Sequence, residues 1–103
     1  MVKIEFIEIY SSLVDESLMP FLDEGEENLN FDFSLFEEFI SRIDVSKKGK
    51  LDVGENTRDL VEYLTGDDLR PPPRSLCIKF SINSKIHEIS IPYADSTYIY
   101  VYS

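Results

Sequence analysis

The chain has 103 residues, 43% of them hydrophobic and 13% aromatic, with a single cysteine and a formal net charge of −10. This length and composition predict one globular domain over residues 1–103 and exclude a disordered chain or one held together by internal disulfides. The excess of acids over bases disfavours direct binding to nucleic acid or to an anionic membrane surface, because both attract lysine and arginine.

The N-terminal stretch MVKIEFIEIY predicts a β-strand and no signal peptide. Apolar residues alternate through Ile4 and Phe6 and resume out of phase at Ile7 and Ile9, which indicates a β-bulge near Phe6. The stretch lacks the cationic start and the cleavage site of a signal peptide, and no apolar run approaches the roughly 18 residues of a membrane span. Because the lone cysteine, Cys77, also suits a reducing compartment, we expect a cytoplasmic protein.

Residues 11–25 predict a short helix, and an acidic loop follows it. Apolar residues recur here at roughly helical spacing, with Ser11 or Ser12 as the cap, and Pro20 keeps the helix short or kinks it. The stretch DEGEENLNFDF, residues 23–33, then carries five acidic residues and no base.

Residues 34–43 show the clearest helical pattern of the chain. Ser34 is the predicted N-cap, and Glu37 completes a capping box three residues later, while Glu38 falls on the solvent side. The predicted buried stripe consists of Leu35, Phe36, Phe39, Ile40 and Ile43.

Residues 51–66 predict a further helix with both of its ends marked. Asp52 and Glu55 form a second capping-box pair, and Gly66 occupies the position where a glycine ends a helix. The predicted apolar stripe consists of Leu60, Val61 and Leu64.

The segment between these helices, DVSKKGKLDVGE at residues 44–55, resembles an EF-hand calcium loop at these twelve positions. Acids stand at the first, ninth and twelfth positions and glycine at the sixth. Lys48 occupies the fifth position, where an oxygen ligand is expected, and Lys47 and Lys50 add charge that repels a cation. We therefore interpret the segment as a lysine-rich turn and expect no metal and no cofactor.

The C-terminal part predicts a three-stranded antiparallel meander. Residues 67–75 contain three consecutive prolines and predict a stiff connector. Strands follow over residues 76–83, 86–93 and 97–103. The hairpin turn lies at Asn83–Ser84 or at Ser84–Lys85, because both registers place the same residues on one face.

These elements predict an α+β fold. Its mostly antiparallel sheet combines the N-terminal strand with the C-terminal meander and packs on two to three helices. The only histidine, His87, shares its strand face with Ile89 and Ile91, so a structural role is predicted for it. Since no nucleophile, phosphate-loop or metalloprotease motif occurs, we expect no catalytic residues and no enzymatic activity.

Three tyrosines alternate along the last predicted strand and form what we call the tyrosine row: Tyr98, Tyr100 and Tyr102. Ile99 and Val101 point to the opposite face. Either the tyrosines lie beneath a helix, or helices cover only the other face and leave the row near solvent. In the second case the row is suited to protein binding, since exposed tyrosines are frequent anchors of interfaces.

Acidic residues dominate the first part of the chain, where no lysine or arginine lies between Lys3 and Arg42. Such a field accelerates encounter with a cationic surface, so the predicted partner is a basic protein. The predicted partner-binding residues are Asp23, Glu24, Glu26, Glu27, Asp32, Glu37 and Glu38, together with the tyrosine row. The alternative is that the acids only keep the protein soluble.

In size and composition the whole chain resembles the immunity proteins that neutralise bacterial nuclease toxins, although it shares no sequence motif with them. These proteins are small, acidic, cytoplasmic antitoxins without catalytic residues. The resemblance implies an inhibitor that blocks the cationic groove of a nuclease in antibacterial competition. Two alternatives remain, namely a nucleic-acid mimic that inhibits a DNA-binding enzyme, as in phage anti-defence, and a structural adaptor subunit.

Overall fold

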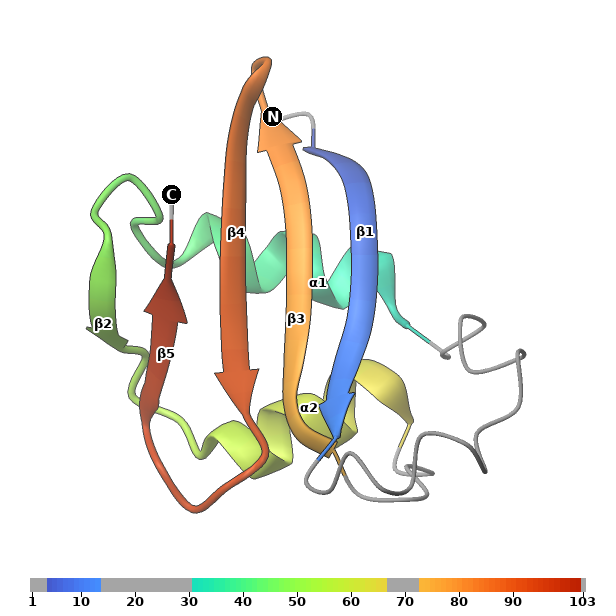
Figure 1. Ribbon diagram of the computed structural model, residues 1–103, viewed down its shortest axis with the longest axis vertical. Helices are drawn as coiled ribbons and strands as arrows, with labels where there is room; N and C mark the ends of the chain where they lie inside the picture. Colours follow the sequence, from blue (N-terminus) through green and yellow to red (C-terminus); the bar gives the residue numbers. More distant parts are fainter. Residues whose placement is uncertain (1–3, 14–30, 67–72, 103) are drawn as a thin grey trace.

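The fold is a five-stranded antiparallel sheet with two helices on one of its faces (Figure 1). The computed structural model describes residues 4–13, 31–66 and 73–102. In chain order its elements are β1 (Ile4–Leu13), α1 (Phe33–Ser41), β2 (Gly49–Asp52), α2 (Thr57–Thr65), β3 (Pro73–Ile82), β4 (Lys85–Pro92) and β5 (Tyr98–Val101). The strands lie in the order β1-β3-β4-β5-β2. The predicted α+β class, with the N-terminal strand beside the C-terminal meander, is confirmed.

The bulge predicted near Phe6 is present in β1. Phe6 pairs with Phe80 and Glu8 with Lys79, which leaves Ile7 as an extra, exposed residue. Because of this extra residue, Ile9 points to the same face of the sheet as Phe6, although the two residues are three positions apart. β1 also continues through residue 13, so the helix predicted from residue 11 onward is wrong at its start, and the remainder of that prediction lies outside the described residues.

The core lies between the inner face of the sheet and the two helices. Across three strands, Phe6 stands opposite Phe80 and Phe80 opposite His87. From α1, the fully buried Phe36 places its ring edge-on to Phe80, with 5.3 Å between ring centroids. The buried hydrophobic residues are Phe36, Phe39, Ile40, Val45, Leu60, Val61, Leu64, Leu76, Ile78, Phe80, Ile89, Ile91, Ile99 and Val101.

Helix α1 begins two residues earlier than a Ser34 cap predicts. Its N-cap is Asp32, whose Oδ1 accepts a hydrogen bond from the Leu35 amide at 3.0 Å. The Asp32 amide in turn donates to the Leu64 carbonyl at 2.8 Å, which anchors the start of α1 to the end of α2. The predicted capping box of Ser34 and Glu37 is therefore wrong, because this long-range hydrogen bond fixes the cap at Asp32.

Helix α2 begins later than predicted, because residues 49–52 form the edge strand β2 instead of helix. β2 pairs with β5, with Lys50 opposite Tyr100 and Asp52 opposite Tyr98. The N-cap of α2 is Asn56, which accepts from the Asp59 amide at 3.1 Å, so the predicted pair of Asp52 and Glu55 does not cap the helix. The predicted glycine end is confirmed, since Gly66 is left-handed at φ +84°.

The start of α2 is fixed by the loop between β4 and β5. The Thr57 amide donates to the Ser96 carbonyl at 2.7 Å, and the Arg58 amide donates to the Ala94 carbonyl at 3.1 Å. The Thr57 hydroxyl also donates to the Ala94 carbonyl, at 2.9 Å. These carbonyls satisfy amides that a helix start leaves without intrahelical acceptors. Neither described helix is long and apolar enough to cross a bilayer.

The hairpin turn between β3 and β4 uses the first of the two predicted registers. Ile82 pairs with Lys85, so Asn83 and Ser84 form a two-residue turn, with φ values of 52° and 69°. Two consecutive left-handed residues define a type I′ turn, whose twist matches that of the strands. The predicted connector ends earlier than expected, because Pro73 opens β3 at the strand's first residue, where proline is tolerated.

Replacing Phe39 by alanine should lower the free energy of unfolding by about 3–5 kcal/mol, because the ring is buried in the core and leaves a cavity. Phe33 is the matched control, since its ring is about half exposed and Phe33→Ala should cost only about 1 kcal/mol. Urea denaturation of both variants tests this. Equal losses would contradict the assigned helix phase.

Replacing Ser84 by glycine should raise the free energy of unfolding by about 0.5–1 kcal/mol, because glycine adopts a positive φ without steric strain. Ser84→Ala keeps a Cβ at the strained position and should bring no such gain. The midpoint of thermal unfolding distinguishes the two variants, and a stabilising Ser84→Ala would show that the turn conformation is not the cause.

Candidate protein-binding surfaces

The tyrosine row lies on the face of the sheet that neither described helix covers (Figure 1). Tyr98, Tyr100 and Tyr102 are 37%, 40% and 56% exposed, while Ile99 and Val101 between them are buried. Of the two predicted alternatives, the structure therefore adopts the one with tyrosines near solvent. The row presents aromatic rings and hydroxyl groups together, a combination that suits contact with another protein.

Residues on the two strands beside β5 contact the tyrosine row and restrain part of it. The Lys50 Nζ lies 4.2 Å from the centroid of the Tyr98 ring, a cation–π contact between β2 and β5. On the other side, Tyr100 pairs with Ser90, which itself pairs with Cys77. These small residues pack among themselves, since the Cys77 thiol contacts the Ser90 hydroxyl at 3.9 Å. The row is thus bordered by a lysine on one flank and by small side chains on the other.

The structure describes three of the seven predicted acidic residues, and these three differ in their surroundings. The Asp32 carboxylate caps α1, so the fold accounts for it without a partner. Glu37 and Glu38 are exposed on α1, and neither has a basic residue of its own helix beside it in the last turn. Asp23, Glu24, Glu26 and Glu27 lie outside the described residues, so their part in binding stays a prediction.

Glu37 and Glu38 line a cleft of about 900 Å³ between α1 and the hairpin end of the sheet. Its walls also include Ile40 from α1, Ile43 and Asp44 from the turn that follows, and Ile82, Lys85 and His87 from β3 and β4. The sequence patterns did not predict this cleft, because it depends on how far the strands extend past α1 (Figure 1).

The cleft and the tyrosine row lie on opposite faces of the sheet but reach the same end of β4. His87 lines the cleft, and the next residue, Glu88, accepts the Tyr102 amide at 2.8 Å through its backbone carbonyl. A flat partner cannot cover both surfaces, whereas a partner that wraps around this end of the sheet can contact both.

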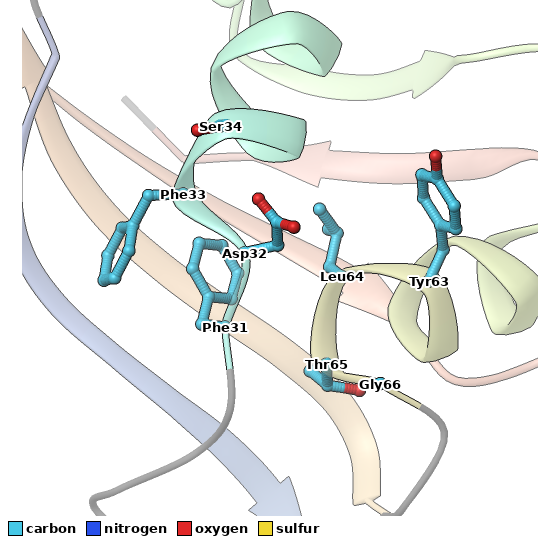
Figure 2. Close-up of a pocket in the computed structure, with 8 residues that line it drawn as sticks. All are labelled: Phe31, Asp32, Phe33, Ser34, Tyr63, Leu64, Thr65 and Gly66. Carbon is cyan, nitrogen blue, oxygen red and sulfur yellow. The ribbon is translucent and has the colours of Figure 1, made fainter.

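A second hollow, of about 450 Å³, lies between the start of α1 and the end of α2 (Figure 2). Phe31, Phe33 and Asp32 border it on one side and Leu64 and Gly66 on the other. Its rings belong to an aromatic cluster, with 5.2 Å between the centroids of Phe31 and Phe33. Both borders continue into segments outside the described residues, so we assign no function to this hollow.

His87 has the structural setting that its strand position predicts. The ring is 4% exposed and packs on Phe80, with 5.7 Å between centroids and 31° between planes. Burial against a phenylalanine ring makes His87 part of the packing beneath the cleft.

The segment that resembles an EF-hand loop uses its acids for local contacts. The Asp44 carboxylate accepts from the Ser46 amide at 3.0 Å and from its hydroxyl, and Asp52 accepts from the Gly54 amide at 2.9 Å. Glu55 lies 3.4 Å from Arg42 in an ion pair. Within the described ranges, no three His, Cys, Asp or Glu side chains come together as metal ligands.

Comparison of the chain with known protein families, with curated proteins and with solved structures finds no match. The functional assignment therefore depends on the geometry of these surfaces.

Replacing Ser46 by alanine should raise the pKa of Asp44. The Ser46 hydroxyl is the largest of the causes that hold this pKa below its ordinary value of 3.8, followed by the Ser46 amide. Because the pKa is lowered in the folded chain, the ionised carboxylate stabilises the fold above that value, and this contribution is lost as the pH falls through the lowered pKa. Carboxyl ¹³C shifts followed against pH measure the pKa of Asp44, and Lys47→Gln, which removes only a weaker charge–charge attraction, should move this pKa less. An unchanged pKa in Ser46→Ala would refute this cause.

Proposed function

We propose that this protein is a non-enzymatic inhibitor that binds a basic protein, in the manner of immunity proteins that block bacterial nuclease toxins. The observation that carries the proposal is the tyrosine row. Tyr98 and Tyr100 at successive outward positions of β5, and Tyr102 directly after it, stand on a sheet face that no described element covers. Tyrosine is common in β-strands in general and is also enriched among the anchors of protein interfaces, so three tyrosines side by side near solvent suit contact with a protein.

The net charge of the chain indicates the sign of the partner's charge. Twenty acids oppose ten bases, and α1 exposes Glu37 and Glu38 without a basic residue in its last turn. A net charge of −10 accelerates encounter with a cationic protein and repels nucleic acid. A nuclease supplies such a cationic surface, because its groove must bind phosphates.

The described surface supports a protein partner over the mimicry of nucleic acid. A phosphate mimic needs carboxylates in an uninterrupted row, but the open face of the sheet alternates them with bases. Lys79 stands between Glu8 and Glu88 in the strand register, and Lys50 lies next to Asp52. Such a mixed face suits a specific protein contact, in which both signs of charge find counterparts.

The test isolates a partner and measures how the tyrosine row contributes to binding it. The protein should capture a basic protein from its source organism, bind it one to one, and abolish its nuclease activity. Joint replacement of Tyr98, Tyr100 and Tyr102 by threonine should accelerate dissociation by about thirtyfold or more, since an interface anchor contributes about 2 kcal/mol or more. Stopped-flow and surface-binding kinetics supply both rates.

Tyr63 is the matched control, because it is a tyrosine exposed on α2 outside the row, and Tyr63→Thr should change the rates less than twofold. The association rate should fall as salt shortens the Debye length to about 8 Å and below. A captured partner that keeps full activity in the complex would refute inhibition and leave the adaptor alternative. Selective capture of a DNA-binding enzyme in competition with its DNA would favour the mimic.

A further inference from the structure

The cleft beside α1 exists because the sheet extends farther than the helices that cover it. β3 and β4 continue past α1 to the hairpin turn (Figure 1), so neither described helix lies over the inner face of the sheet at that end. Ile4 and Ile82 pair with each other there and are only partly buried, although they belong to the apolar face of the sheet. The cleft of about 900 Å³ lies over these residues.

The floor of the cleft is apolar. Ile40 is 5% exposed and Val45 is 7% exposed, and both reach the cleft from the helix side. Ile43 and Ile82 are partly buried and complete the floor. An aliphatic chain lying on this floor would remove apolar surface from water on both sides, which is favourable in proportion to the area covered.

The rim of the cleft is acidic on the side formed by α1 and the turn after it. Glu37, Glu38 and Asp44 contribute three carboxylates, while Lys85 is the only base among the described lining residues. The pKa of Asp44 is held low by the Ser46 hydroxyl, so this group stays ionised at neutral pH. The C-terminal end of α1 adds partial negative charge, and its C-cap residue Arg42 is engaged in an ion pair with Glu55 at 3.4 Å.

We infer that this cleft binds a lysine or arginine side chain of the basic partner. The aliphatic stem lies on the isoleucine floor and the cationic head meets the carboxylates of Glu37 and Glu38, because long basic side chains combine these two properties. This inference rests on the proposed function and deepens it, because it names the chemical group of the partner that the inhibitor binds. The cleft opens at the end of the sheet where Tyr102 lies, so one partner can occupy both surfaces.

The direct test uses a peptide of defined charge as the probe. The peptide acetyl-Leu-Arg-Ile-Arg-Leu-amide is titrated into protein with ¹³C-labelled methyl groups, in parallel with the same peptide carrying citrulline at both arginines. Citrulline keeps the shape of the side chain and removes the charge. Methyl signals of Ile40, Ile43, Val45 and Ile82 should shift with the arginine peptide, and the citrulline peptide should bind about three- to tenfold more weakly.

Two variants with equal charge change separate the cleft from the overall field. Glu37→Gln with Glu38→Gln should weaken binding of the arginine peptide about three- to tenfold, whereas Glu8→Gln with Glu88→Gln, on the opposite face, should change it less than twofold. Ser41→Tyr, on the exposed side of α1 that borders the cleft, should block the cleft and leave the thermal midpoint nearly unchanged. Equal losses in both double variants, or methyl shifts confined to Ile99 and Val101 between the tyrosines of the row, would overturn the inference. Concentration-dependent shifts of the cleft methyls without peptide would place a second copy of the chain there and overturn it as well.

The partner itself then separates this inference from the proposed function. If Ser41→Tyr and the Glu37–Glu38 double variant bind the captured partner as tightly as the original protein, while the tyrosine variants do not bind, the cleft inference fails and the proposed function stands. If no basic partner is bound and inhibited, the proposed function fails. Peptide binding at the cleft would then remain as a measured property of the site.

Discussion

Burial of one face of the sheet by both described helices is the constraint on which the rest of the described structure depends. Phe36 of α1 packs edge-on to Phe80 at 5.3 Å between centroids, and the stripe of α2 covers the strands farther along. With two helices on that face, the opposite face keeps its tyrosines in water. Because the strands extend past α1, the covered face is itself open at one end. Both candidate surfaces thus follow from the same unequal coverage.

This arrangement separates the residues that stabilise the fold from those that we propose for binding. Glu37 and Glu38 are exposed on α1 and lie outside the core, so their replacement removes little buried apolar area. The tyrosine row also lies outside the core cluster, but Tyr98 and Tyr100 are only 37% and 40% exposed, so their replacement removes some packing. Among the predicted acids that the structure describes, Asp32 is the one that caps α1, and its amide joins the two helices. Changes in affinity at Glu37 and Glu38 can therefore be measured without a loss of fold, whereas a change at Asp32 alters both.

Local patterns in the sequence predicted the parts of the fold that local interactions decide. The helical stripes, the left-handed end at Gly66 and the bulge beside Phe6 belong to this group. The strand at residues 49–52 was missed because its pairing with β5 decides its conformation, and the cap at Asp32 was missed because a carbonyl of α2 fixes it. The cleft and the separation of the glutamates from the tyrosines depend on the relative placement of layers, which no periodicity within one element encodes.

The pairing of β1 with β3 has a consequence for the order in which the chain folds. β3 and β4 are joined by a two-residue turn, and hairpins of this kind form within about 1–10 μs. β1 pairs with a strand that lies beyond both helices in the chain, so its pairing must first close a long loop. At a synthesis rate of about 5–20 residues per second, β3 is made several seconds after β1, so β1 has no strand to pair with during that time. β1 therefore stays unpaired for longer than either strand of the β3–β4 hairpin.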